Sequence, residues 1–449
     1  MNKHLALVFA FFFVTAMPNN ANATPPSNSC PAAKEVDRHL RLVVEKPRQE
    51  LASLSAMAIN NGQVVYQAQF GSRRIDAKDS SKSLPANEHT LYRIASISKM
   101  VTAIGAMVLV EQGKLDLDRD ASDYLGFTLR NPHFPKRVIT TRMLLTHQSS
   151  LRDDAGYSFP FGQTLQSFLV PGAAHYGQGT QWSPKSPGLY FSYVNLNFGV
   201  IAAIMEKAGG ERFDRLMHRL VLQPLKIRGA FNVDSLPAED IQQLATLYRK
   251  QSNEIWNARG PWNAQVDDVQ GKKPAAREEL RRYELGSNPT LFSPQGGLRI
   301  SVGGLGRLMQ MFIGKGSLDG VQLLQPSSVA ALLHEHWRYD EDAKNGDTEQ
   351  GLFQAWSLGL QHFIGKAGKQ HGDYLGALNG VPFTGFGHLG FAYGLESGFV
   401  FDPDTGNGVI YAHGGSAADP ETHRGEHSSL SIWEEGILAA LLNCLRPAP

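Results

Sequence analysis

The stretch Tyr92-Arg-Ile-Ala-Ser-Ile-Ser-Lys-Met-Val-Thr-Ala103 holds the only Ser-x-x-Lys motif of the chain, Ser96 and Lys99. Residues from Ser96 to about Glu111 are good helix formers, and Gly113 follows as a C-terminal stop signal. Residues three apart share one helix face, so we expect the Ser96 hydroxyl and the Lys99 amine to point into the same space. The unpaired backbone N–H groups at the start of a helix favour negative charge, so they would stabilise an alkoxide at Ser96. The same groups, together with removal from water, would favour the neutral amine form of Lys99. The pair is therefore a candidate nucleophile and base for acyl transfer.

The composition is that of a globular protein. The chain has 449 residues, of which 42% are hydrophobic and 19% charged, and this length predicts one large domain or two to three ordinary ones. Lys and Arg number 43 against 42 Asp and Glu. This balance gives no electrostatic footprint for nucleic acid or for a charged membrane surface.

The N-terminus has the pattern of a secretory signal. A short basic segment, Met1-Asn-Lys-His4, precedes an apolar run from Leu5 to Met17 that is too short to span a bilayer. Ala21-Asn22-Ala23 supplies the small-x-small cleavage pattern. We therefore expect a signal peptide over residues 1–23, export to the periplasm or the medium, and no integral membrane segment after cleavage. An uncleaved anchor is the alternative.

The two cysteines lie at opposite ends of the chain. Cys30 stands just before a helix predicted over Ala32–Leu51, and Cys444 ends a helix predicted over Ser429–Leu445. In an oxidising compartment we expect them to form a disulfide that joins the two ends, with two unpaired thiols as the alternative.

Two hairpins are predicted, one near each end of the chain. In the first, β-rich runs within Ser55–Phe70 flank Asn61-Gly62, a strong hairpin signal. In the second, strands at Leu395–Asp402 and Val409–Ala412 enclose a turn rich in Gly and Asp.

Helix and hairpin at the start, hairpin and helix at the end, and a helical middle predict two lobes. We expect an α/β domain built from residues 31–95 and 291–446, with a mainly helical lobe, residues 96–290, inserted between its halves.

Tyr193-Val194-Asn195 is the only Tyr-x-Asn in the chain and precedes a helix predicted over Leu196–Ala208. A phenol near a cationic Lys99 is expected to have a depressed pKa and to shuttle a proton to a leaving group. The Asn195 amide is placed to orient Lys99 or a substrate carbonyl. The alternative is that Asn195 caps the helix and Tyr193 packs in the core.

His388-Leu389-Gly390 is one of four His-x-Gly triplets, and only its place at the edge of the predicted sheet recommends it. The backbone N–H groups of Phe391, at this strand edge, and of Ser96 would together form an oxyanion hole. A purely structural histidine is the alternative.

No metal and no organic cofactor are predicted. His423 and His427 stand four apart, but Pro420 and Gly425 argue against a helix that would align them, so a solvated loop is expected. Serine, lysine and tyrosine suffice for acyl transfer.

Taken in order, the three motifs resemble the serine hydrolase family of class C β-lactamases and D-alanyl-D-alanine carboxypeptidases. Further stretches support the resemblance, namely Thr141–Leu151, Phe191-Ser-Tyr-Val-Asn195, Ser293-Pro-Gln-Gly-Gly-Leu298 and Phe386-Gly-His-Leu-Gly390. It covers about residues 33–445. It implies an α/β, β-lactamase/transpeptidase-like fold: an antiparallel sheet flanked by the N- and C-terminal helices, plus an inserted all-α lobe.

The resemblance also implies roles. Ser96 would be the acylated nucleophile, Lys99 its base and Tyr193 the proton shuttle, with Asn195 in their hydrogen-bond network. His388, followed by Gly390, would bind a substrate carboxylate and steer Tyr193.

Class C β-lactamases carry Lys where this chain has His388, whereas His-x-Gly is similar to D-peptidases and esterases. The expected substrates are therefore D-Ala-D-Ala-type peptides or small esters. A β-lactamase and a non-catalytic penicillin-binding or cell-wall-fragment-binding protein are the alternatives, and the oligomeric state and deacylating base stay open.

Overall fold

The computed structural model describes residues 29–365, 372–373, 375 and 383–445. The predicted signal peptide, residues 1–23, lies outside this range. In the described part of the chain, no helix is long and apolar enough to cross a membrane.

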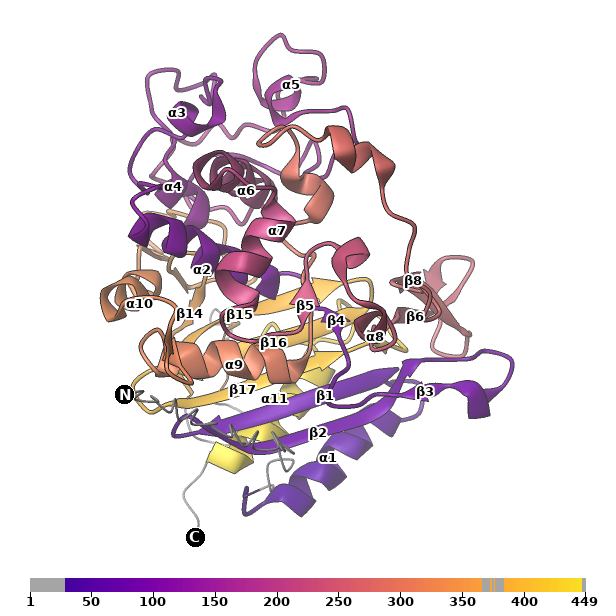
Figure 1. Ribbon diagram of the computed structural model, residues 1–449. Helices are drawn as coiled ribbons and strands as arrows, with labels where there is room; N and C mark the ends of the chain where they lie inside the picture. Colours follow the sequence, from indigo (N-terminus) through magenta and orange to yellow (C-terminus); the bar gives the residue numbers. More distant parts are fainter. Residues whose placement is uncertain (1–28, 366–371, 374, 376–382, 446–449) are drawn as a thin grey trace, which may run out of the picture.

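A large antiparallel sheet lies between two layers of helices (Figure 1). Its strand order is β12-β13-β14-β15-β16-β17-β1-β2-β3. The strands are β12 (Trp337–Arg338), β13 (Ala355–Trp356), β14 (Gln361–Phe363), β15 (Gly385–Ala392), β16 (Leu395–Asp402), β17 (Asn407–His413), β1 (Ser53–Asn60), β2 (Gln63–Arg74) and β3 (Leu84–Pro85).

Both predicted hairpins are confirmed. Asn61 and Gly62 connect β1 to β2 with φ of 49° and 76°, the positive values that a tight hairpin turn requires. The second hairpin joins β16 and β17, and β17 also pairs with β1, so the two ends of the chain meet in the middle of the sheet.

The terminal helices α1 (Ala33–Glu45) and α11 (Ile432–Leu442) pack together on one face of the sheet (Figure 1). The predicted helix over Ala32–Leu51 is wrong at its C-terminal end: Lys46 is already extended, because Pro47 disfavours the helical conformation in the residue before it. Ser431 and Glu434 form a capping box that begins α11.

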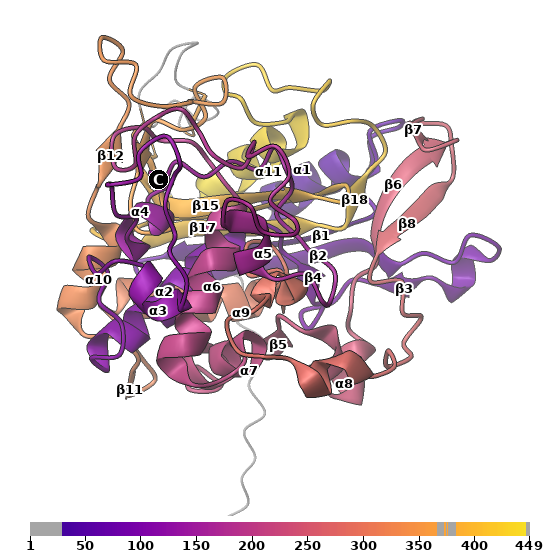
Figure 2. The same cartoon turned by 90° about the horizontal axis from the view of Figure 1, so that it is seen from above.

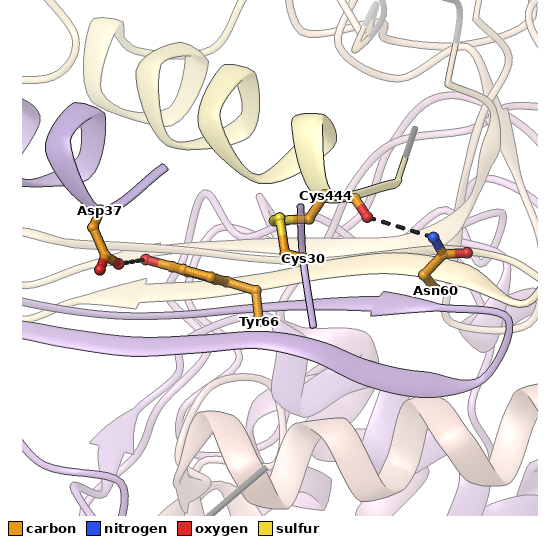
Figure 3. The surroundings of a disulfide bond; sticks show 5 residues. All are labelled: Cys30, Asp37, Asn60, Tyr66 and Cys444. Carbon is orange, nitrogen blue, oxygen red and sulfur yellow. Dashed lines mark hydrogen bonds between the residues drawn. A yellow bond between two sulfur atoms is a disulfide. The ribbon is translucent and has the colours of Figure 1, made fainter. Parts of the chain in front are cut away.

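Figure 3 shows Cys30 and Cys444 joined in a disulfide beneath these helices, as expected from the sequence. Nearby, the Tyr66 hydroxyl donates to Asp37 Oδ1 at 2.5 Å, and Asn60 Nδ2 donates to the Cys444 carbonyl at 3.5 Å. The bridge thus ties the segment before α1 to the end of the chain over the central strands.

The opposite face of the sheet carries α9 (Val302–Ile313) and the inserted residues (Figures 1 and 2). Helix α2 (Ile97–Glu111) is buried from Ile97 to Leu109 and packs between α6 (Leu196–Gly209) and β15. The shorter helices of this part are α3 (Ser122–Leu125), α4 (Thr141–Leu145), α5 (Leu165–Leu169), α7 (Phe213–Met217), α8 (Ala238–Ile241) and α10 (Pro326–Leu333).

Part of the span from 96 to 290 is not helical. Strands β6 (Leu247–Ser252), β7 (Ile255–Trp256) and β8 (Trp262–Val266) form a small antiparallel sheet, and β6 also pairs with β18 (Gly415–Ser416). Asn253 and Glu254 have positive φ and turn the chain between β6 and β7, which a continuous helix does not permit. Figure 2 shows this hairpin at the side of the molecule where β3 lies.

Candidate active site

Ser96 stands at the start of α2, held there by a short strand on its N-terminal side. Strand β4 (Tyr92–Arg93) pairs with β9 (Arg299–Ile300), and Ala95 then takes a φ of 49°. A positive φ at a residue with a Cβ is strained, and such strain persists only where the surroundings fix the chain. The turn leaves the Ser96 side chain free of any helix-capping bond, so its hydroxyl is available for other partners.

Lys99 is completely buried one helical turn further on. Its Nζ lies 2.9 Å from Ser96 Oγ, and it donates to Asn195 Oδ1 at 2.7 Å and to the Gln295 carbonyl at 3.1 Å. Burial lowers the pKa of Lys99 to about 7, against the opposing charge of Asp153. The amine is therefore about half neutral near pH 7.

Asn195 lies at the N-terminus of α6, but its side chain does not cap the helix. While its Oδ1 accepts from Lys99, its Nδ2 donates to Asp153 Oδ2 at 2.9 Å. Asp153 takes over the capping role, since its carboxylate accepts from the backbone N–H groups of Asn195 and Leu196 at 2.8 and 2.9 Å. The predicted contact between Asn195 and Lys99 is present in the structure.

Tyr193 is sandwiched between two rings. His147 stacks on it with centroids 4.6 Å apart, and Phe353 stacks on it at 5.0 Å. The Lys99 amine lies 4.8 Å from the Tyr193 ring centroid, and the phenol and the Ser96 hydroxyl are hydrogen-bonded. The three side chains predicted to move protons thus meet at one point.

The expected depression of the Tyr193 pKa is wrong. Burial raises the pKa of Tyr193, and the hydrogen bond with Ser96 opposes that rise only in part. The expectation assumed a fully cationic lysine next to an accessible phenol. Burial instead disfavours both charges, which leaves a protonated phenol beside an amine that is about half neutral near pH 7.

His388, on β15, belongs to the same cluster and is 3% exposed. Its ring centroid lies 6.1 Å from that of Tyr193, and its Nδ1 lies 2.5 Å from the Leu389 carbonyl, to which a neutral ring donates. Burial and the charge of Lys99 lower the pKa of His388 to about 3. The imidazole is therefore neutral near pH 7 and offers no positive charge for the substrate carboxylate expected there.

At Gly390, β15 lies close to the start of α2. A Cβ there would collide with the Ile94 carbonyl and Ser397 Oγ, and would lie 3.2 Å from the backbone nitrogen of Ser96. Only glycine fits this gap. Phe391 follows with its side chain 47% exposed; the oxyanion role of its N–H stays a prediction.

These side chains open into one cavity of about 650 Å³. It is lined, among others, by Ser96, Tyr193, Asn195, Gln295, His388 and Phe391. A volume of this size is typical of a small-molecule site, and the elements that build it come from both the sheet and the helical part. Within the described residues, no group of His, Cys, Asp or Glu side chains is arranged to hold a metal ion.

Sequence reasoning missed three residues that shape the site. Asp153 orients Asn195, His147 supports Tyr193, and Arg93 lines the cavity beside the nucleophile. His147 lies in the stretch Thr141–Leu151, whose resemblance to the family was a signal that it matters. For Asp153 the sequence carried no comparable signal.

Comparisons with known proteins identify the family of this chain. The Beta-lactamase family profile matches residues 37–427. Two similar relatives are named "Beta-lactamase". The one from Pseudomonas fluorescens is 27% identical over 54% of this chain and 62% of its own length. The one from Providencia stuartii is 25% identical over 56% of this chain and 59% of its own length. "Esterase EstB" of Burkholderia gladioli is 26% identical over 48% of this chain and 56% of its own length. The matches thus span about three-fifths of these relatives.

Among solved structures, an octameric penicillin-binding protein homologue from Pyrococcus abyssi superimposes with a TM-score of 0.61, covering 86% of this chain and 74% of that one at 20% identity. This likeness concerns the fold, which is the mixed α/β architecture expected from the sequence. The family profile covers most of the chain, from within helix α1 to the loop that precedes helix α11. The protein therefore belongs to the Beta-lactamase family.

Proposed function

We propose that the protein is an exported serine hydrolase that works through an acyl-enzyme on Ser96. The observation that carries the proposal is the placement of Lys99: a fully buried amine, 2.9 Å from the Ser96 hydroxyl, with a pKa of about 7. A base is most effective when its pKa lies near the working pH.

The contacts of Lys99 support proton transfer from Ser96 to Lys99. A neutral amine has two N–H groups, and the oxygens of Asn195 and Gln295 accept them. The nitrogen lone pair is then left facing the Ser96 hydroxyl. As Ser96 Oγ bonds to the substrate carbonyl carbon, its proton passes to Lys99 Nζ.

Tyr193 is suited to the role of acid. With its pKa raised, the phenol is protonated at neutral pH and hydrogen-bonded with Ser96 Oγ, the oxygen that attacks. When the bond from the carbonyl carbon to the leaving group breaks, Tyr193 donates its proton to the leaving atom and recovers one from Lys99 through the same cluster. Water then releases the acyl group from Ser96.

For substrates we propose D-Ala-D-Ala-type peptides or small esters. The neutral His388 in the third motif and the similarity to an esterase favour this class. β-Lactam hydrolysis is the second candidate, because two of the similar relatives are named β-lactamases. The signal pattern of residues 1–23 and the disulfide support export to the periplasm or the medium.

Labelling and a substrate panel test the proposal. A fluorophosphonate or a fluorescent penicillin is expected to label Ser96, and Ser96→Ala is expected to abolish labelling with little change in thermal stability. Rates on a nitrophenyl ester, a D-Ala-D-Ala peptide and nitrocefin then rank the substrate classes. A folded wild-type protein that is not labelled contradicts the proposal, and acylation without turnover indicates a penicillin-binding protein instead.

A further inference from the structure

Arg93 is a half-buried cation in the wall of the catalytic cavity, three residues before Ser96. Its Nε donates to the Gly296 carbonyl at 3.3 Å and its Nη2 to Ser293 Oγ at 3.4 Å, while its guanidinium lies 4.9 Å from the Tyr393 ring centroid. Both hydrogen bonds are long, and both acceptors are neutral.

Arg93 has no ion-pair partner among the described carboxylates, and the residues outside the described ranges include no Asp or Glu. The nearby Asp267 is engaged elsewhere, since it accepts two hydrogen bonds from Arg299 at 2.8 and 3.0 Å.

Arg299 also stands directly opposite Arg93 across the β4–β9 pair. Asp267 is thus the one carboxylate near two guanidinium groups and is hydrogen-bonded to Arg299, and both burial and the charge of Arg299 lower the pKa of Arg93. A buried charge without a partner is costly to keep, so its retention beside the nucleophile calls for a ligand of opposite charge.

We propose that Arg93 binds a carboxylate of the substrate. A guanidinium presents several N–H donors in a planar fork that matches a carboxylate, and the contacts with Ser293 and Tyr393 hold that fork in place. His388 is neutral and cannot supply this charge. The inference rests on the proposed hydrolase function and adds to it that the substrate is an anion.

The test compares esters with and without a carboxylate. The substrates are p-nitrophenyl butyrate, p-nitrophenyl hemiglutarate with the charge on the acyl side, and m-carboxyphenyl butyrate with the charge on the leaving group. Arg93→Gln is expected to lower kcat/KM about 10–100-fold on at least one acidic ester and less than about threefold on the neutral one. Arg93→Lys is expected to retain part of the preference.

Arg219→Gln is the matched control, because Arg219 pairs with Glu211 on the surface, outside the residues that line the cavity. An unchanged ratio between acidic and neutral esters in Arg93→Gln, with Ser96 still labelled, overturns the role of Arg93 alone. Absence of Ser96 labelling in the wild type overturns the hydrolase proposal itself.

A wild-type measurement covers the case in which Arg93→Gln does not fold. Glutarate is expected to inhibit hydrolysis of p-nitrophenyl butyrate competitively, and glutaramide, its neutral diamide, is expected not to. Equal inhibition by the two compounds contradicts the proposal.

Discussion

The chemistry of this site depends on how thoroughly single side chains are removed from water. Lys99 is fully buried and has a pKa of about 7, while burial raises the pKa of Tyr193. Desolvation penalises charge on either group. The same environment therefore supplies a neutral amine to accept a proton and an intact phenol to donate one.

His147 is predicted to position Tyr193. Its Nδ1 accepts from the Val194 N–H at 2.9 Å, which fixes the neutral ring that stacks on Tyr193. His147→Asn retains a side chain that tolerates the φ of 56° found there but removes the stacking ring. We expect kcat to fall about 10–100-fold, because small displacements of catalytic groups are costly, while KM changes little.

Steady-state kinetics and the pH profile of kcat check this prediction. His362→Asn is the matched control. His362 lies on strand β14, its ring stacks on that of Phe386 with centroids 4.3 Å apart, and it does not line the cavity. If His147→Asn and His362→Asn alter kcat equally, His147 has only a structural role.

For single residues, the sequence predicted which side chains form the site better than it predicted their burial and pKa. Ser96, Lys99, Tyr193, Asn195 and His388 were all named, because motif order alone marks them, and the structure brings them together. Asp153 was missed since its contacts with Asn195 join loops far apart in the chain. The Tyr193 pKa was predicted in the wrong direction, because burial is a property of the folded packing.

Among the elements, the contact between β15 and the start of α2 determines the geometry of the site. Gly390 lets β15 approach the backbone nitrogen of Ser96. Gly390→Ala is expected to push the two elements apart, to reduce acylation of Ser96 about 100-fold or more, and to destabilise the fold by about 1–3 kcal/mol through overpacking.

Labelling rates and thermal unfolding measure both effects of Gly390→Ala. Gly303→Ala is the control. Gly303 lies within helix α9, and a Cβ there would meet only Ser301 Oγ at 3.7 Å, which is an ordinary contact. Wild-type acylation rates in Gly390→Ala would show that the close approach is not needed.

Local signals predicted the elements unevenly. Asn61-Gly62 located the β1–β2 hairpin because a two-residue turn requires those residue types. Helix α1 was predicted too long, since the expected helix ran on to Leu51, past Pro47, whereas the chain is already extended at Lys46. The small sheet of β6, β7 and β8 was not predicted. The parallel pairing of β6 with β18 joins segments more than a hundred residues apart.

At the scale of the whole molecule, both chain ends build the sheet that supports the site. The disulfide closes this arrangement across a sequence separation of 414 residues. Cys30→Ala with Cys444→Ala is expected to lower the free energy of unfolding by about 2–5 kcal/mol, because the unfolded chain gains freedom when the long loop opens.

Chemical denaturation and kinetics separate stability from activity here. The bridge lies with α1 and α11, and neither cysteine lines the cavity, so kcat/KM of the folded double variant at low temperature should match the wild type. A loss of activity without a loss of stability would mean that the termini act on the site directly.

If Lys99 acts on Ser96 as a neutral base, the rate of Ser96 acylation must follow the protonation of the Lys99 amine. Burial lowers the pKa of Lys99 to about 7, so the ammonium form, which cannot accept a proton, dominates at lower pH. The rate of Ser96 acylation by a fluorophosphonate, measured from about pH 5 to 9 with peptide mapping, should rise about tenfold per unit below pH 7 and level off above pH 8. A rate independent of pH over this range would show that Lys99 is not the base, and a label on any residue other than Ser96 would show that Ser96 is not the nucleophile.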